Sequence, residues 1–112
     1  MIKVVYCITK KPGMTEAEFF DYWQNVHGPI GASLPGLRKL VQSHAVRPSD
    51  DTRQADYDGV AELWFDDVDA LLAARQSEEW RISSEDEKNF IDHSRVAYFV
   101  SEEHEITLPT HC

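Results

Sequence analysis

One helix and one strand are encoded in residues 15–46, TEAEFFDYWQNVHGPIGASLPGLRKLVQSHAV. Thr15 and Glu18 have the spacing of a capping box, in which each side chain accepts a hydrogen bond from a free backbone N–H group at the helix start. The apolar residues that follow recur at steps of four, three and four: Phe19, Trp23, Val26 and Ile30. This spacing predicts a helix with one apolar side. We expect the helix to end or kink at Gly28-Pro29, because proline lacks an N–H donor and restricts the preceding residue.

The rest of the chain shows further strand patterns and a short helix pattern. After the turn Pro35-Gly36, alternating polarity predicts a long strand, residues 37–46. Further strands are expected at residues 2–9, 57–65 and 95–101, with a polar loop at residues 47–56. Asp66 or Asp67 has the side chain to cap a short helix, which carries Val68, Leu71 and Leu72.

The stretch between that short helix and the last strand shows weaker patterns. Trp80 and Ile82 do not form a helical stripe with their neighbours, so this part is interpreted as irregular. Residues 84–87 have the spacing of a second capping box, which would start a turn of helix before Phe90 and Ile91.

The elements therefore follow the order β-α-β-β-α-β. Split β-α-β units of this kind form a ferredoxin-like fold, an α+β architecture in which a four-stranded antiparallel sheet carries both helices on one face. The other face stays uncovered, and neither side of the strands at 37–46 and 57–65 is wholly polar. We therefore expect a homodimer, packed sheet against sheet as a dimeric α+β barrel. With no linker or repeat, residues 1–112 are expected to form one domain.

Charge and composition exclude several classes of partner. The 11 Lys+Arg and 20 Asp+Glu give a net charge of −9, which argues against nucleic acid and anionic membranes because both require basic patches. No apolar run has the roughly 18–20 residues of a membrane span. The N-terminus lacks the pattern of a signal peptide, and two separated cysteines do not make a disulfide framework. A cytoplasmic location is therefore expected.

His27 is the first candidate for a catalytic role. A histidine side chain has an ordinary pKa of about 6.5, so it exchanges protons readily at neutral pH. His27 lies where the predicted helix meets Gly28-Pro29, at the mouth of whatever the helix covers. The alternative is structural, since a histidine at a helix end is also stabilised by the negative end of the helix dipole.

Polar side chains on two predicted strands form a second candidate group. Gln42 and His44 face the same way, and Asp58, Glu62 and Trp64 share one side of the next strand. If these two sides lie on the same face of the sheet, the histidine and the two carboxylates converge beside the indole of Trp64. Such an arrangement moves the pKa values of the titratable groups toward neutrality. The alternative is a buried hydrogen-bonded network, or charges at a dimer seam, without chemistry.

Four aromatic residues are candidates for binding a substrate, and the sequence lacks the familiar cofactor motifs. Tyr6 and Tyr98 can donate phenol hydrogen bonds to a substrate oxygen, and Phe20 and Trp23 can line an apolar pocket, although all four also suit a plain core. No Gly-rich phosphate loop, dinucleotide motif or short metal-ligand spacing occurs. We therefore expect neither a cofactor nor a metal, even though His27, His44 and Glu62 could be drawn as a ligand set.

Three stretches of the chain resemble the EthD-domain family in the expected order. These are FFDYWQNVHGPIGASLPGLRKLVQSHAV at residues 19–46, DGVAELWFD at residues 58–66 and FIDHSRVAYFVSEEHEI at residues 90–106. The resemblance implies a dimeric α+β barrel, in agreement with the pattern of elements. It also implies a role for His27, because in methylmuconolactone methylisomerase-like relatives a histidine at the end of the first helix is implicated in catalysis.

The resemblance further implies a class of chemistry. Relatives of the family, which include fungal dehydratase-like proteins, perform cofactor-free acid/base reactions on small cyclic or aromatic oxygenated molecules. The leading hypothesis is therefore an isomerase, dehydratase or related lyase of catabolism or secondary metabolism, with His27 moving a proton and His44, Gln42 or a tyrosine orienting the substrate. The alternatives are a non-catalytic binding or accessory protein of an oxygenase system, and a cofactor-free monooxygenase.

Overall fold

The computed structural model describes residues 1–48 and 55–110 of the chain. Its strands are β1 (Ile2–Ile8), β2 (Lys39–His44), β3 (Gly59–Phe65) and β4 (Ala97–Glu102). Its helical segments are α1 (Glu16–Tyr22), the π-helical turn η1 (Trp23–His27), α2 (Gly28–Gly31), α3 (Val68–Arg75), α4 (Glu78–Asp86) and the 3₁₀ turn η2 (Glu87–Asn89). None of the helices in these two ranges is long and apolar enough to cross a membrane.

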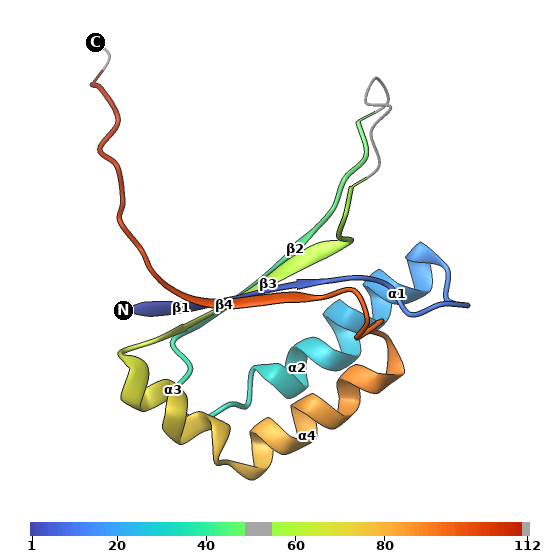
Figure 1. Cartoon of the computed structure of the whole chain (residues 1–112), viewed down its shortest axis with the longest axis horizontal. Coiled ribbons are helices and arrows are strands. Elements are labelled where there is room, and N and C mark those ends of the chain that lie inside the picture. The colour runs from blue at the N-terminus through green and yellow to red at the C-terminus, as the bar shows by residue number, and fades with distance from the viewer. Residues whose placement is uncertain (49–54, 111–112) are drawn as a thin grey trace.

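The four strands form one antiparallel sheet in the order β2-β3-β1-β4. All the helices lie on one face of this sheet, and the opposite face is bare (Figure 1). This is the ferredoxin-like α+β fold expected from the order of elements. The strands begin or end up to two residues inside the predicted ranges, except that β4 continues one residue further, to Glu102. Residues 49–54 of the expected loop lie outside the described residues.

The core lies between the helices and the covered face of the sheet, in two clusters. One is built around Phe19, Trp23 and Phe90, which pack on Ile8 and Ala61. The other joins β1 and β3 to α3 and is formed by Val4, Phe65, Leu71 and Ala74. The covered face is therefore formed by the even-numbered residues of β1 and the odd-numbered residues of β3, because neighbouring side chains of a strand point to opposite sides.

The first helical region continues beyond the point where it was expected to end. Thr15 and Glu18 form the predicted capping box, and α1 passes into the π-helical turn η1 rather than stopping. In this wider turn the backbone N–H of Gly28 donates to the carbonyl of Trp23, and Pro29 then lies in the first turn of α2, where its missing donor costs little. The prediction of an end or kink at Gly28-Pro29 was therefore only partly right.

The interpretation of the stretch around Trp80 as irregular was wrong. The α4 helix spans this stretch, and Ser77 caps it by accepting a hydrogen bond from the backbone N–H of Trp80 at 3.1 Å. The expected capping box at residues 84–87 is absent because these residues continue or follow the helix. The helix escaped detection because none of its residues is buried, so it has no continuous apolar stripe.

Candidate functional site

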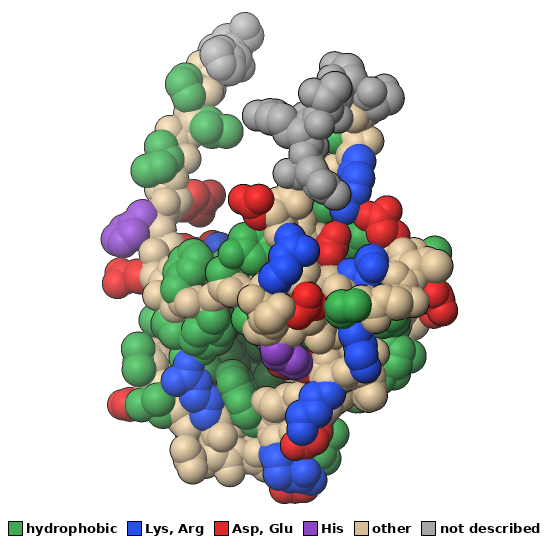
Figure 2. Space-filling view, turned by 45° about the vertical axis from the view of Figure 1, so that its right-hand side comes forward, with side chains coloured by type: hydrophobic (Ala, Val, Ile, Leu, Met, Phe, Trp, Pro, Cys, Tyr) green, Lys and Arg blue, Asp and Glu red, His purple; other side chains and the backbone are tan. Residues whose placement is uncertain are grey.

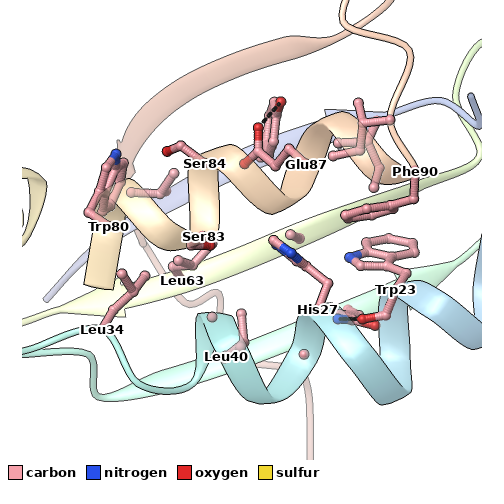
Figure 3. A pocket seen from close by; sticks show the side chains of 18 of the residues that line it. Trp23, His27, Leu34, Leu40, Leu63, Trp80, Ser83, Ser84, Glu87 and Phe90 are labelled. Carbon is pink, nitrogen blue, oxygen red and sulfur yellow. Dashed lines mark hydrogen bonds between the residues drawn. The ribbon is translucent and has the colours of Figure 1, made fainter. Parts of the chain in front are cut away.

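A cavity of about 280 Å³ lies between the sheet and the helices. Its floor comes from β1, β2, β3 and β4, and its walls come from η1, α2 and α4, as Figure 3 shows. Most of the lining is apolar: Val4, Ile8, Trp23, Leu34, Leu40, Ala61, Leu63, Trp80, Phe90 and Ile91. A space-filling view shows a hollow surrounded by hydrophobic side chains (Figure 2). Such a volume is just below the roughly 300–1,000 Å³ of typical small-molecule sites.

His27 lies in the wall of this cavity and forms a pair with Asp86. The Nδ1 atom of His27 is 2.8 Å from Oδ2 of Asp86, and the two side chains are only 14% and 11% exposed. The ring of Phe90 packs against the imidazole with its centroid 4.7 Å away. The η1 turn therefore supplies the histidine, and the end of α4 supplies its acidic partner.

Asp86 is held by three donors. Its Oδ1 accepts hydrogen bonds from the Tyr22 hydroxyl at 2.5 Å and the Asn89 amide at 3.0 Å, while Oδ2 faces His27. Burial alone would raise the pKa of Asp86, but the hydrogen bonds from Tyr22, His27 and Asn89 together hold it below its ordinary value. Asp86 is therefore a carboxylate at neutral pH and acts only as an acceptor.

This carboxylate fixes the tautomer of His27. Because Asp86 can only accept, the proton of the neutral imidazole must be on Nδ1, and Nε2 carries a free lone pair. No other residue of the described chain forms a hydrogen bond with Nε2. A histidine oriented by a carboxylate, with its second nitrogen free in the wall of an apolar cavity, is suited to remove and return a proton.

The π-helical turn connects His27 to Gln42 and His44. The carbonyl of Trp23 accepts a hydrogen bond from Nε2 of Gln42 at 2.8 Å, and Oε1 of Gln42 faces Nε2 of His44 at 3.0 Å. Gln42 lines the cavity, whereas His44 does not. His44 lines a shallow depression beside it, together with Gln24 and Gln42.

His44 is stacked between two aromatic rings. The centroids of Trp23 and Phe20 lie 4.5 Å and 4.8 Å from that of His44, and both rings are nearly parallel to the imidazole. Burial lowers the pKa of His44, which favours the neutral ring. Phe20 therefore packs on His44 and is not part of the cavity wall, where the sequence had placed it.

A second polar group lies in the cavity wall at Glu87. Its Oε1 accepts a hydrogen bond from the Tyr6 hydroxyl at 3.1 Å and lies 3.1 Å from Nε2 of His93. Burial and the neighbouring carboxylate raise the pKa of Tyr6, so this phenol stays protonated and donates. Tyr98 also lines the cavity, with its ring edge-on to Tyr6 at 6.2 Å and its hydroxyl bonded to Arg75.

The expected convergence of Gln42 and His44 with Asp58, Glu62 and Trp64 does not occur. Pairing of Gln42 with Ala61 places Gln42 and His44 on the covered face of the sheet, so Glu62 and Trp64 point to the bare face. There Glu62 binds Lys3 at 2.7 Å, and the Trp64 indole donates to Glu103. The Asp58 carboxylate accepts from the backbone of Lys10 at 2.7 Å and binds Arg47, outside the cavity.

Four site residues were missed by sequence reasoning: Ser83, Ser84, Asp86 and Glu87. They belong to α4 or to the turn after it, and that helix was not recognised. Ser77 could have indicated the start of this helix, because a serine followed by two glutamates is typical of a helix N-terminus. The polarity of β3 could also have identified its covered face, because residues 59, 61, 63 and 65 contain no charge.

In the two described ranges, no group of three or more His, Cys, Asp or Glu side chains has the geometry to hold a metal ion. His27, His44 and Glu62, which the sequence allowed as a ligand set, are divided between the covered and bare faces of the sheet. Of the polar residues that line the cavity, His27 is instead paired with Asp86, and Glu87 with Tyr6.

Solved structures share this fold with modest sequence identity. An EthD family protein from Bacillus halodurans superposes with a TM-score of 0.76 at 23% identity, over 93% of this chain and 99% of that one. A dimeric ferredoxin-like protein from Thermobifida fusca has a TM-score of 0.67 at 11% identity, over 88% of this chain and 87% of that one. A variant of SnoaB, a cofactor-independent oxygenase from Streptomyces nogalater, has a TM-score of 0.63 at 18% identity, over 97% of each chain.

At these identities the structural likeness concerns the fold alone. No curated protein matches the sequence. The family model for the EthD domain matches residues 11–94, which include α1, η1 with His27, and α4 with Asp86. Because this match spans most of the chain and the fold agrees with it, the protein belongs to the EthD domain family.

Proposed function

We propose that the protein is a cofactor-independent acid/base enzyme, an isomerase, dehydratase or lyase, that acts on a small cyclic or aromatic oxygenated compound. The observation that carries this proposal is that His27, in the wall of a largely apolar cavity, lies 2.8 Å from the carboxylate of Asp86. Catalysis by proton transfer needs a group that accepts a proton and gives it back, and His27 has the required free nitrogen.

The chemical step would start at a carbon atom next to a carbonyl or lactone group. Nε2 of His27 takes a proton from this carbon, and the electron pair of the C–H bond moves to form an enolate. Asp86 stabilises the imidazolium that results, as carboxylates do in other histidine dyads. His27 then returns the proton to a different atom in an isomerisation, or to a leaving hydroxyl group in a dehydration.

The negative charge that develops on the substrate oxygen needs a hydrogen-bond donor. Ser83 and Ser84 line the cavity from α4, and within the described residues their hydroxyls have no hydrogen-bond partner. These serines, rather than His44, would donate the hydrogen bond to the substrate oxygen. His44 does not line the cavity, and one of its ring nitrogens is bonded to Gln42. Trp23, Trp80 and Phe90 would hold a flat ring by apolar contact.

Deuterium exchange tests the proposal without knowledge of the natural substrate. Small ring ketones and lactones, such as 1-indanone, are incubated with the protein in D₂O, and the loss of the proton next to the carbonyl is followed by NMR. We expect the protein to accelerate exchange of at least one of them by about 10²-fold or more, and His27→Ala to abolish the acceleration. Equal rates with the wild-type protein and with His27→Ala would contradict the proposal.

A cofactor-free oxygenase is the second candidate. It is favoured by the fold shared with SnoaB, a cofactor-independent oxygenase, and by an apolar cavity with a histidine base. Oxygen consumption with electron-rich phenols would distinguish this activity from isomerisation, which consumes no oxygen. Saturable binding of such compounds without exchange or oxygen uptake would instead indicate the third possibility, a binding or accessory protein.

The enzyme is proposed to work as a homodimer. The bare face of the sheet carries Val5, Val41, Val60 and Phe99 among its polar residues, and Phe99 is 53% exposed. Dimeric proteins occur among the structural neighbours, including the one from Thermobifida fusca. Packing two such faces together would remove these apolar side chains from water and leave both cavities, which lie on the helical side, accessible.

A further inference from the structure

We propose that Glu87 recognises a phenolic hydroxyl group on the ligand. The cavity would then prefer ring compounds that can donate a hydrogen bond to the carboxylate of Glu87. The inference rests on the proposed function, because it concerns a ligand in the same cavity. Glu87 would determine which ligands bind, and it takes no part in the proton transfer at His27.

Glu87 stands out because only one of its carboxylate oxygens is occupied. Oε1 receives both Tyr6 and His93, each at 3.1 Å. Within the described chain, Oε2 takes part in no hydrogen bond. Glu87 nevertheless lines an apolar cavity with its side chain only 21% exposed, and Figure 3 shows it beside Ser84 on the wall formed by α4 and the turn after it.

The two partners of Oε1 leave Oε2 as the oxygen of Glu87 that is open to a further donor. Burial and the carboxylate raise the pKa of Tyr6, so its hydroxyl stays protonated and remains bonded to Oε1. His93 lies on the solvent side with its ring 45% exposed and also binds Oε1. A carboxylate has lone pairs on both oxygens, and Oε2 of Glu87 is not fully buried, so it can accept a further hydrogen bond. A ligand hydroxyl in the cavity would supply the donor.

The walls indicate that the hydroxyl belongs to a flat ring. Trp23, Trp80, Phe90 and the imidazole of His27 all face the same space of about 280 Å³. Aromatic walls favour aromatic ligands by stacking and edge-to-face contacts. A phenol also binds a carboxylate more strongly than a neutral acceptor, because hydrogen bonds to charged groups are stronger.

Binding of 4-methylphenol and of its methyl ether, 4-methoxytoluene, tests this inference. The two share a ring and a methyl group, and only the phenol can donate. Binding is followed by ¹H–¹⁵N NMR through the indole N–H signals: Trp23 and Trp80 line the cavity, and Trp64 on the bare face serves as an internal control. We expect the dissociation constant of the phenol to be at least about tenfold lower than that of the ether.

Two variants assign the preference to Glu87. In Glu87→Gln, which keeps the shape and removes the charge, the preference for the phenol is expected to fall below about threefold. Glu79→Gln is the matched control, because Glu79 is an exposed residue of α4 outside the cavity, and it should keep the wild-type ratio. Melting curves of all three proteins show whether the fold is kept.

Three results would overturn the inference: failure of the phenol to shift the signals of Trp23 and Trp80, equal affinity of the wild-type protein for phenol and ether, or a preference unchanged in Glu87→Gln. The last would mean that an acceptor other than Glu87 receives the hydroxyl. These results do not depend on the exchange of 1-indanone, so the failure of this inference and the failure of the proposed catalysis can be told apart.

Discussion

Asp86 and Glu87 are consecutive residues, yet their carboxylates bind different histidines. Asp86 lies 2.8 Å from Nδ1 of His27, and Glu87 lies 3.1 Å from Nε2 of His93. The two side chains diverge where α4 passes into the 3₁₀ turn η2. This junction therefore orients the base of the proposed reaction on one side and the proposed recognition carboxylate on the other.

The first prediction concerns the orienting role of Asp86. Asp86→Asn removes the charge that holds the His27 proton on Nδ1, so it should remove most of the about 10²-fold acceleration of exchange expected for an active ring ketone. Glu85→Gln on the same helix is the control, since Glu85 is exposed and pairs only with Lys88 among the described residues. An exchange rate unchanged in Asp86→Asn would remove Asp86 from the mechanism.

The local elements of the fold could be predicted because their signals are local. Thr15 and Glu18 bind each other's backbone, and Phe19 and Trp23 are one helical turn apart, so neighbouring residues were sufficient. Asp86 lies 59 positions from His27 in the chain. No local pattern connects them, and their pairing exists only after α4 has packed beside η1 on the sheet.

The sequence also did not reveal which face of each strand the helices would cover. Alternation shows which residues share a side, but it does not show which side the helices will cover. Glu62 and Trp64 were grouped correctly with each other and wrongly with Gln42, because the pairing register of β2 and β3 decides this. Register depends on the whole sheet and on the helices that pack on it.

The second prediction concerns acid sensitivity at His44. Because burial lowers the pKa of His44, the unfolded chain binds a proton at a higher pH than the folded chain does. The neutral ring contributes its full stability above the ordinary pKa of 6.5, and this contribution is lost as the pH falls from there toward the lower folded-state value. The melting temperature should therefore decrease on acidification.

His44→Phe separates this contribution from other titrating groups. Phenylalanine can stack between Trp23 and Phe20 and cannot be protonated, so the decrease in melting temperature between about pH 7.5 and 5.5 should be smaller than in the wild-type protein. His104→Gln is the control, because His104 is 77% exposed, and it should leave the decrease unchanged. A decrease as large in His44→Phe as in the wild-type protein would contradict the assignment.

The third prediction concerns the close approach of Trp23 to β3. A Cβ atom added at Gly59 would lie 2.6 Å from the Trp23 ring and 2.5 Å from the carbonyl of Ser43, so buried atoms would have to move. Gly59→Ala should lower the free energy of unfolding by about 1–3 kcal/mol, measured by urea denaturation. At Gly31 the added atom would meet Leu40 at an ordinary 3.5 Å, and Gly31→Ala should be tolerated. Equal stabilities of the two variants would show that the contact is not restrictive.

The fourth prediction tests the proposed dimer. The wild-type protein should have a mass of about 25.8 kDa (2 × 12.9 kDa) by light scattering at micromolar concentration. Phe99→Glu places a charge on the bare face of the sheet and should shift the mass toward 12.9 kDa. Leu72→Glu, at a similarly exposed position on α3, should stay dimeric. A wild-type mass of 12.9 kDa at high concentration would refute the dimer.

The strand order has a further consequence for colloidal behaviour. Because β4 forms an edge of the sheet, the backbone groups on its outer side are available to other chains. Residues 97–101, AYFVS, carry no charge, and Tyr98, Phe99 and Val100 are exposed. An uncharged edge of this kind is a template for aggregation, which the net charge of −9 opposes by repulsion. Near the isoelectric point of about 4.8 that repulsion vanishes, and precipitation should begin through pairing of these edges.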